Sequence, residues 1–332
     1  MSDFKLASNI FDDEVVQEPI RAGFGRGLKA AGEADENVVA LCADLTDSTQ
    51  MSLFKEAFPD RFIEIGIAEQ NLVTVASGMA RAGKVPFTSS YAAFSPGRNW
   101  EQIRTTIALN NQPVKVIGSH AGVSVGPDGA THQMLEDIAI MRVMPNMIVI
   151  APGDSIEAEK ATKVIAKNKK PVYMRLAREK TPIFSTVDSP FEVGKAYNLR
   201  EGNDITLLGT GTMSYQMLKA AEILSKQGIS AEVIHVPTIK PLDEETILAS
   251  IKKTGRAITA EEAQAAGGFG SAVAELLGEN LPTPLHRIGM KDRFGESGEP
   301  NQLLNYFGLS AEHIAETAKQ FIESKAKYHQ DF

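Results

Sequence analysis

The sequence of 332 residues has little cysteine, tryptophan or histidine, with one, one and six residues of these types. A single cysteine, Cys42, excludes an intramolecular disulfide and a structural zinc site built from four cysteines. No apolar run approaches the roughly 20 residues that a membrane-spanning helix needs, so we expect no membrane partner. The polar and acidic stretch Met1–Asp13 does not resemble a secretory signal peptide. These absences predict a cytoplasmic protein.

Positive charge is also in short supply. The chain has 34 Lys and Arg against 42 Asp and Glu, a net charge of −8. This balance argues against nucleic acid as the main partner, although a local basic pocket is compatible with it. The hydrophobic fraction of 43% is typical of a globular protein. Because single cores stop growing near about 250–300 residues, the length favours two domains.

Short runs rich in Val and Ile alternate with longer amphipathic stretches, which is typical of parallel strands joined by helices. In Ala68–Ala82 apolar residues recur at three- and four-residue spacing, and this range and Trp100–Leu109 are predicted helices. From Lys180 to Pro190 the periodicity fails, so we predict a first domain over 1–185, a linker over 186–195 and a second domain over 196–332. The strands predicted for the first domain are Val38–Ala43, Phe62–Ile65, Val85–Thr88, Val114–Gly118, Met147–Ala151 and Val172–Leu176.

The second domain repeats the alternation, so the predicted fold class is α/β, with two domains that each hold a mostly parallel sheet flanked by helices. The turn Gly209-Thr210-Gly211 lacks the third glycine of a dinucleotide-binding loop, which favours a structural turn over a phosphate site. Gly267-Gly268-Phe269-Gly270 is expected to open a closely packed helix. The predicted elements are strands Ile205–Leu208, Glu232–Val236 and Ala257–Ala260 and helices Tyr215–Gln227 and Asp243–Lys253.

Polar residues that could carry chemistry gather between Asp44 and His132. Glu69 stands at a strand-to-helix junction, where an acid can also serve only to stabilise the helix N-terminus, by about 0.3–1 kcal/mol. His120, Asp128 and His132 lie in a glycine-rich loop after a predicted strand, at the edge where α/β sheets bind ligands. Their spacing fits no standard zinc pattern. Hydrogen bonding and proton transfer to a polyhydroxylated substrate fit better, with capping by Asp128 as the structural alternative.

From Arg21 to the C-terminus the chain resembles the C-terminal half of the transketolase group of thiamine diphosphate enzymes. Each motif alone is weak, but their order and spacing together are specific. The resemblance implies a pyrimidine-binding domain followed by a transketolase C-terminal domain. The motifs are Ala43-Asp44-Leu45, Gly66-Ile67-Ala68-Glu69-Gln70, Asp128-Gly129-Ala130-Thr131-His132-Gln133, Pro145-Asn146-Met147 and Asp292-Arg293-Phe294-Gly295-Glu296-Ser297-Gly298.

The resemblance implies a cofactor site around Glu69, the glutamate that would bind the aminopyrimidine ring and activate the cofactor. Tyr91 and Phe94 would lie against that ring, since aromatic contacts contribute about 0.5–1.5 kcal/mol beyond area burial; for Tyr91 a plain core role is the alternative. Asp44 is also placed among the cofactor-binding residues. The sequence departs from the family at Gly97, where transketolases usually add a third aromatic ring.

The resemblance also implies a substrate site. His132, the second catalytic candidate, would contact the donor sugar and Asp128 a sugar hydroxyl. Four residues would bind the sugar phosphate, because guanidinium groups bind such anions in bidentate fashion. For one of these positions, Arg178 is an alternative to Arg175. The histidine at position 120 favours a sugar-phosphate transketolase, whereas the sequence around Glu69 is closer to that of deoxyxylulose phosphate synthases. The four expected phosphate ligands are Arg21, Ser48, His120 and Arg175.

No Gly-Asp-Gly stretch occurs in the chain, although the family binds the diphosphate and Mg²⁺ through such a stretch in its first half. The metal ligands are therefore expected on a partner, and none on this chain. The resemblance implies the C-terminal subunit of a split transketolase, which pairs with an N-terminal subunit in a heterotetramer and transfers a two-carbon ketol unit from a ketose phosphate to an aldose. The alternatives are a synthase-like or specialised sugar transketolase subunit, and a noncatalytic binding or regulatory module of the same fold.

Overall fold

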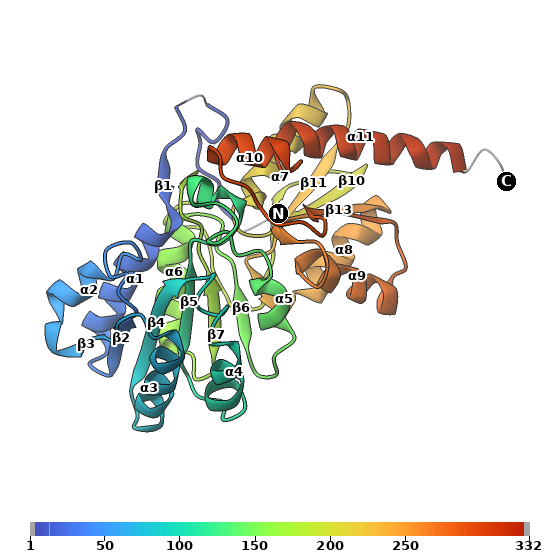
Figure 1. Cartoon of the computed structure of the whole chain (residues 1–332). Helices are drawn as coiled ribbons and strands as arrows, with labels where there is room; N and C mark the ends of the chain where they lie inside the picture. Colours follow the sequence, from blue (N-terminus) through green and yellow to red (C-terminus); the bar gives the residue numbers. More distant parts are fainter. Residues whose placement is uncertain (1–3, 13, 329–332) are drawn as a thin grey trace.

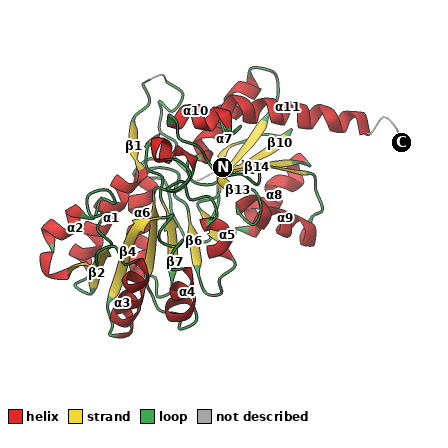
Figure 2. Cartoon of the chain, in the orientation of Figure 1, coloured by secondary structure: helices red, strands yellow, loops and turns green. Residues whose placement is uncertain are grey.

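The computed structural model describes residues 4–12 and 14–328. Its two larger sheets lie side by side with helices on both faces (Figures 1 and 2). Part of the stretch Met1–Asp13, on which the expectation about a signal peptide rests, lies outside the described residues. Within the described ranges, no helix is both long enough and apolar enough to cross a membrane.

The first sheet has seven strands in the order β12-β6-β7-β5-β4-β2-β3. All neighbours pair in parallel except β12, which runs antiparallel to β6. Side chains alternate between the two faces: on β2, Ala40 faces one core and Leu41 the other. The strands are β2 (Val38–Cys42), β3 (Phe62–Glu64), β4 (Val85–Tyr91), β5 (Lys115–Ser119), β6 (Ile148–Ile150), β7 (Val172–Arg175) and β12 (Thr238–Lys240).

Helices cover both faces of this sheet. One face packs on α1 (Ile20–Ala34), α2 (Ser52–Ala57) and α6 (Ser155–Lys167). The other packs on α3 (Glu69–Arg81), on α5 (Asp137–Arg142), and on α4 (Trp100–Gln102) with its π-helical continuation Ile103–Ala108. Helices α1 and α6 approach closely because Gly23 has no side chain; a Cβ there would lie 1.7 Å from the Ser155 carbonyl oxygen.

The second sheet has five strands in the order β14-β13-β10-β11-β9, of which only β9 is antiparallel. Helices α7 and α11 lie on one face, with α11 packed on α7, and α8 and α9 lie on the other, while α10 packs against the turns at Val123–Asp128. The elements are β9 (Tyr197–Arg200), β10 (Ile205–Gly209), α7 (Met213–Ser225), β11 (Ala231–His235), α8 (Glu244–Thr254), β13 (Ala257–Gln264), α9 (Phe269–Asn280), β14 (Leu285–Met290), α10 (Pro300–Tyr306) and α11 (Ala311–Tyr328).

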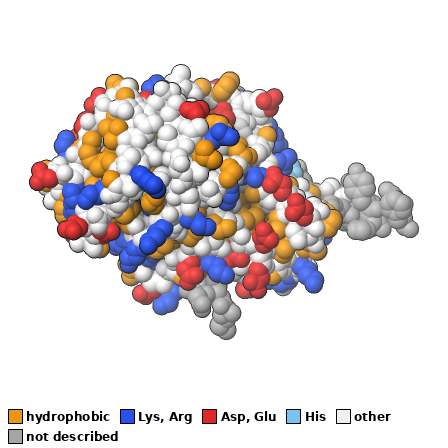
Figure 3. All heavy atoms as spheres, turned by 90° about the horizontal axis from the view of Figure 1, so that it is seen from below, with side chains coloured by type: hydrophobic (Ala, Val, Ile, Leu, Met, Phe, Trp, Pro, Cys, Tyr) orange, Lys and Arg blue, Asp and Glu red, His pale blue; other side chains and the backbone are white. Residues whose placement is uncertain are grey.

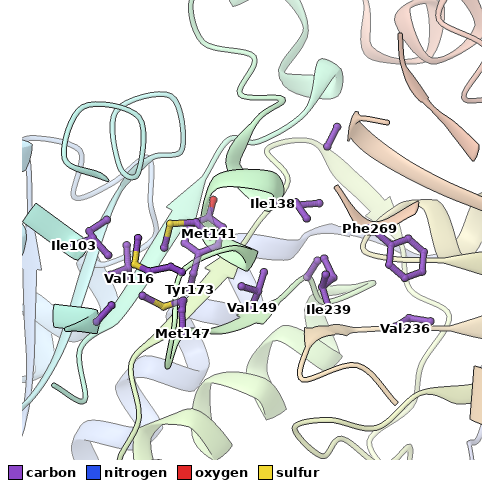
Figure 4. Packing of buried hydrophobic residues seen from close by; sticks show 14 of the residues in the cluster. Ile103, Val116, Ile138, Met141, Met147, Val149, Tyr173, Val236, Ile239 and Phe269 are labelled. Carbon is purple, nitrogen blue, oxygen red and sulfur yellow. The ribbon is translucent and has the colours of Figure 1, made fainter. Parts of the chain in front are cut away.

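The two halves of the chain share a core and a sheet. Met141, Val149 and Tyr173 of the first half belong to one buried cluster with Val236 and Phe269 of the second (Figure 4). In addition β12, which follows β11 in sequence, completes the edge of the first sheet. The domain boundary near 186–195 stays a prediction, because both the shared core and the shared sheet cross it.

The predicted fold class is confirmed, with two mostly parallel sheets flanked by helices. Two local details go beyond the predictions. The stretch after Lys180, where the periodicity fails, begins with a short strand, β8 (Lys180–Pro182), which pairs with β1 (Gln17–Pro19). The helix predicted over Trp100–Leu109 is present, and it is π-helical over Ile103–Ala108, a distinction that apolar spacing does not reveal. A single 3-10 turn lies at Pro59–Arg61, and Val123–Asp128 forms two 3-10 turns with a kink at Gly126.

On the face seen from below, Lys and Arg side chains are interspersed with acidic and hydrophobic ones (Figure 3). No broad basic area covers this face, in keeping with the net charge of −8. Localised groups of charge at the ends of strands are therefore more informative about function than the general surface.

Candidate active site

The parallel strands of the first sheet end at one edge, and the residues singled out from the sequence follow these ends. Asp44 comes after β2, Glu69 after β3 and His120 after β5, while Tyr91 is the last residue of β4. This edge is where open α/β sheets bind their ligands. The topology therefore gathers at one edge residues that are far apart in sequence.

Glu69 is the first residue of α3 and is only 5% exposed. Its two carboxylate oxygens lie 3.2 and 3.3 Å from Nη1 of Arg98. The neighbouring Asn99 donates from Nδ2 to the Glu69 carbonyl oxygen at 2.8 Å and to Oγ of Ser95 at 3.1 Å. The segment after β4 thus holds both the backbone and the side chain of Glu69.

Aromatic rings form the wall beside this carboxylate. The centroids of Tyr91 and Phe94 lie 6.0 Å apart with nearly parallel planes. Tyr91 also stacks on His120 at 3.8 Å, and Phe94 meets the edge of His132 at 5.4 Å. The Arg98 guanidinium carbon lies 4.2 Å from the Phe94 centroid. The structure therefore joins Glu69, Tyr91, Phe94, His120 and His132 through direct contacts or through Arg98.

His120 is buried and held in one tautomer. Arg21 Nη1 lies 3.2 Å from its Nε2, and a guanidinium can only donate, so Nε2 accepts. The ring proton then sits on Nδ1, which lies 2.9 Å from Oγ of Ser119. Burial, followed by the charges of Arg21 and Arg178, lowers the pKa of His120 to about 3. His120 is therefore a neutral hydrogen-bonding group at physiological pH.

Arg175 does not take part in the cluster that the sequence predicted for it. Its Nε donates to Oδ2 of Asp137 at 2.8 Å and its Nη2 to the Glu262 carbonyl oxygen at 2.6 Å, and its side chain is 7% exposed. The side chain points into the protein because Arg175 is still part of β7, on the same face as Tyr173. The expectation that Arg175 binds phosphate is corrected here.

Arg178 is the better-placed of the two arginines. Its charge lowers the pKa values of both Arg21 and His120, although burial is the larger cause for each. Its Nη1 donates to the Val125 carbonyl oxygen at 2.6 Å. Two guanidinium groups and a neutral imidazole thus lie within electrostatic range at this edge, an arrangement suited to an anion.

Gly97 is required by the backbone. A Cβ at this position would lie 2.0 Å from the Ala93 carbonyl oxygen. The third aromatic ring that is usual in transketolases could not be accommodated here without moving the segment. The wall therefore consists of Tyr91 and Phe94, with the Arg98 guanidinium packed on the latter.

The loop that carries His132 is fixed by the second half of the chain. Gln133 donates from Nε2 to the carbonyl oxygens of Val123 at 3.0 Å and of Glu296 at 2.9 Å. A Cβ on Gly129 would lie 2.4 Å from Oγ of Ser297. The motif Asp292–Gly298 therefore packs directly against the predicted substrate loop.

Three predicted site residues have looser surroundings. Asp44 and Asp128 are exposed and Ser48 is half-buried. The backbone N–H of Asp44 donates to Glu64 at 2.7 Å, which orders the loop after β2.

Arg98, Asn99 and Asp137 were missed in the sequence analysis. A lone arginine after Pro-Gly gives no indication of a role in the site. The alternation of side chains along β7, by contrast, could have indicated that Arg175 has a buried partner.

The cofactor implied by the sequence resemblance can be tested against this geometry. Arg98 shows that a planar, nitrogen-bearing group can contact the Phe94 ring and the Glu69 carboxylate at once. An aminopyrimidine ring is also planar and also carries N–H donors, so the residues fit it. Among the described residues, no three His, Cys, Asp or Glu side chains are grouped to hold a metal ion.

Comparisons with known proteins agree with this architecture. The profile "Transketolase, pyrimidine binding domain" matches residues 18–183, and "Transketolase, C-terminal domain" matches 194–314. A protein of Methanocaldococcus jannaschii described as a transketolase C-terminal section is 45% identical, over 94% of this chain and 98% of its own length. A 6-deoxy-6-sulfo-D-fructose transketolase subunit of a Clostridium species is 44% identical, over 88% and 91%.

Other relatives are longer or have known structures. Mouse transketolase-like protein 2 is 38% identical, and the match covers 91% of this chain but 48% of that protein. A solved structure described as "Split gene transketolase, inactive beta4 tetramer" superposes with a TM-score of 0.86 at 41% identity, covering 92% of this chain and 98% of that one. The chain belongs to the transketolase family, of which it carries the pyrimidine-binding and C-terminal domains.

Proposed function

We propose that this chain is the C-terminal subunit of a split, thiamine diphosphate-dependent transketolase, which transfers a two-carbon ketol unit from a ketose phosphate to an aldose. The proposal depends on one observation. Glu69 and Phe94, at the carboxyl edge of the sheet, both contact the same planar, nitrogen-bearing group, the guanidinium of Arg98. The similarity to transketolase C-terminal sections over nearly their full length supports it.

The roles follow from the contacts. Glu69 hydrogen-bonds the aminopyrimidine ring, while Phe94 and Tyr91 form its aromatic wall and Asp44 lies at the neighbouring strand end. When bound, thiamine diphosphate supplies a carbon nucleophile and an electron sink, which amino-acid side chains lack. The buried setting of Glu69, at 5% exposure, protects its hydrogen bond from competing water.

The substrate side of the site uses the remaining polar groups. His132 and Asp128 bind the hydroxyl and carbonyl oxygens of the sugar. Arg21, Ser48, His120 and Arg178 bind its phosphate, with Arg178 in the role first expected of Arg175. Because His120 is neutral, it contributes hydrogen bonds, and the two arginines supply the positive charge.

The diphosphate and Mg²⁺ are assigned to a partner chain. Mg²⁺ prefers carboxylate and phosphate oxygens, and the Gly-Asp-Gly stretch that provides such ligands in the family is absent from this sequence. We therefore propose a cytoplasmic heterotetramer with an N-terminal transketolase subunit. The related split-gene beta4 tetramer is described as inactive, which supports the need for a second type of subunit.

Reconstitution tests the proposal. The chain, a partner subunit that carries the diphosphate-binding domain, and both together are assayed with thiamine diphosphate and Mg²⁺. We expect ketol transfer from xylulose 5-phosphate to ribose 5-phosphate only in the mixture, and a loss of at least a hundredfold for Glu69→Gln.

Several outcomes would contradict the proposal. Full activity of the lone chain would overturn the split enzyme, and Glu69→Gln activity within tenfold of wild type would overturn the role of Glu69. Turnover of pyruvate with glyceraldehyde 3-phosphate in place of the sugar phosphates would identify a deoxyxylulose phosphate synthase-like subunit. A mixture without any turnover or cofactor binding would indicate the noncatalytic module.

A further inference from the structure

Arg98 occupies a position between the two groups that define the pyrimidine site. Its Nη1 lies 3.2 and 3.3 Å from the Glu69 carboxylate oxygens, and its guanidinium carbon lies 4.2 Å from the Phe94 centroid. The guanidinium is thus both an ion-pair partner of the carboxylate and a cation packed on the ring. Both partners have roles in the proposed function.

The chemistry of this contact resembles that of the group we expect to bind there. A guanidinium and an aminopyrimidine are both planar and delocalised, and each presents N–H donors in its plane and can stack on an aromatic ring. The Glu69 oxygens and the Phe94 face that Arg98 covers cannot contact the ring at the same time. Where the ring uses these contacts, it competes with Arg98 for them.

The burial of the two residues indicates which of them moves. The Glu69 side chain is 5% exposed, and its backbone carbonyl is held by Asn99 at 2.8 Å. The Arg98 side chain is 51% exposed, so it can rotate into solvent without opening the core. An exposed cation regains its hydration on leaving, which keeps the cost of displacement small.

We propose that Arg98 is an internal occupant of the pyrimidine site, which fills the place of the cofactor ring in the unloaded subunit and must leave Glu69 and Phe94 when the cofactor binds. This proposal rests on the proposed function, since it takes the cofactor from it. Arg98 then affects the affinity of the site for the cofactor in two ways. In the unloaded subunit it pairs with the Glu69 carboxylate and covers the Phe94 ring, and it therefore competes with the cofactor for both.

The test measures cofactor affinity, not turnover. Wild type, Arg98→Met and the matched control Arg104→Met are each assembled with the partner subunit and titrated with thiamine diphosphate and Mg²⁺ by calorimetry. Arg104 is an exposed arginine on the adjacent π-helix. Trp100, the only tryptophan, lies two residues from Arg98 and provides an independent fluorescence signal.

We expect Arg98→Met to bind about tenfold more tightly than wild type, which corresponds to about 1.4 kcal/mol, and Arg104→Met to bind like wild type. A crystal structure of the loaded assembly should show Arg98 away from both Glu69 and Phe94. Equal or weaker binding by Arg98→Met, or a loaded structure with Arg98 still on both groups, overturns the occupant and leaves the proposed function intact. Failure of both wild type and Arg98→Met to bind overturns both proposals.

Discussion

The Arg175 guanidinium and the Asp137 carboxylate form a buried ion pair, with Nε and Oδ2 at 2.8 Å and side-chain exposures of 7% and 0%. Tyr173 donates to the same carboxylate oxygen at 2.8 Å, and Arg175 reaches across to the Glu262 carbonyl oxygen in the second half of the chain. The pair thus connects the sheet that carries the site to the neighbouring domain.

Replacement of Arg175 should therefore affect stability before catalysis. Arg175→Met leaves Asp137 charged and unpaired in the core, which should lower the free energy of unfolding by about 3–5 kcal/mol, as measured by urea denaturation. In the double variant with Asp137→Asn no buried charge is left alone, so part of this loss should be recovered. A single variant as stable as wild type would show that the pair contributes nothing.

Replacement of Arg178 should have the opposite profile. Arg178→Ala removes a half-buried cation from the predicted phosphate site, so the KM for a phosphorylated donor should rise at least tenfold while the free energy of unfolding changes by about 1 kcal/mol or less. Steady-state kinetics of the assembled enzyme measure this effect. An unphosphorylated ketose is the control; an equal rise in its KM would contradict phosphate recognition.

His120 should make stability depend on pH. Its pKa is lowered to about 3 in the folded protein, against about 6.5 when unfolded, so the unfolded state takes up the proton first. Stability is therefore lost as pH falls below about 6.5. Between pH 7 and pH 5 this contributes about 2 kcal/mol, which should be missing from the urea denaturation of His120→Gln. Equal pH dependence in the two proteins would contradict the lowered pKa.

Gly97 offers a steric prediction with a matched control. Gly97→Ala places a Cβ 2.0 Å from the Ala93 carbonyl oxygen and should destabilise the protein by about 1–3 kcal/mol, with weaker cofactor binding because Phe94 shifts. At Gly78, inside α3, an added Cβ would have nothing within 4 Å. Gly78→Ala should stabilise by about 0.5–1 kcal/mol. Thermal unfolding compares the two, and an equally stable Gly97→Ala would show that the segment adapts.

Most of the fold could be predicted because its buried strands are continuous runs rich in Val and Ile. Strands of a parallel sheet are covered by helices on both faces, so nearly all of their side chains are apolar. The runs around Val38, Val85 and Val172 all correspond to observed strands. β12 and β8 could not be predicted, because three residues with pairing partners far along the chain leave no periodic pattern.

The site was predicted to the level of its region but not of every side chain. Glu69 and His120 follow strand ends, so topology alone brings them to one edge. Arg175 and Arg178 are three residues apart, and only the end of β7 between them decides which one points inward. The position of Arg98 in the site could not be predicted, because its contacts with Glu69 and Phe94 are not part of any sequence motif.

The position of β12 has a consequence for how this polypeptide can be divided. Its residues Thr238–Lys240 hydrogen-bond to β6 and close one edge of the sheet that carries the site. A fragment that stops in the 186–195 segment would expose the backbone of β6 as an open edge, which invites pairing with other chains. It would also expose the apolar surface under Val236 and Phe269. We therefore expect the two family domains to fold together, and a fragment cut between them to aggregate.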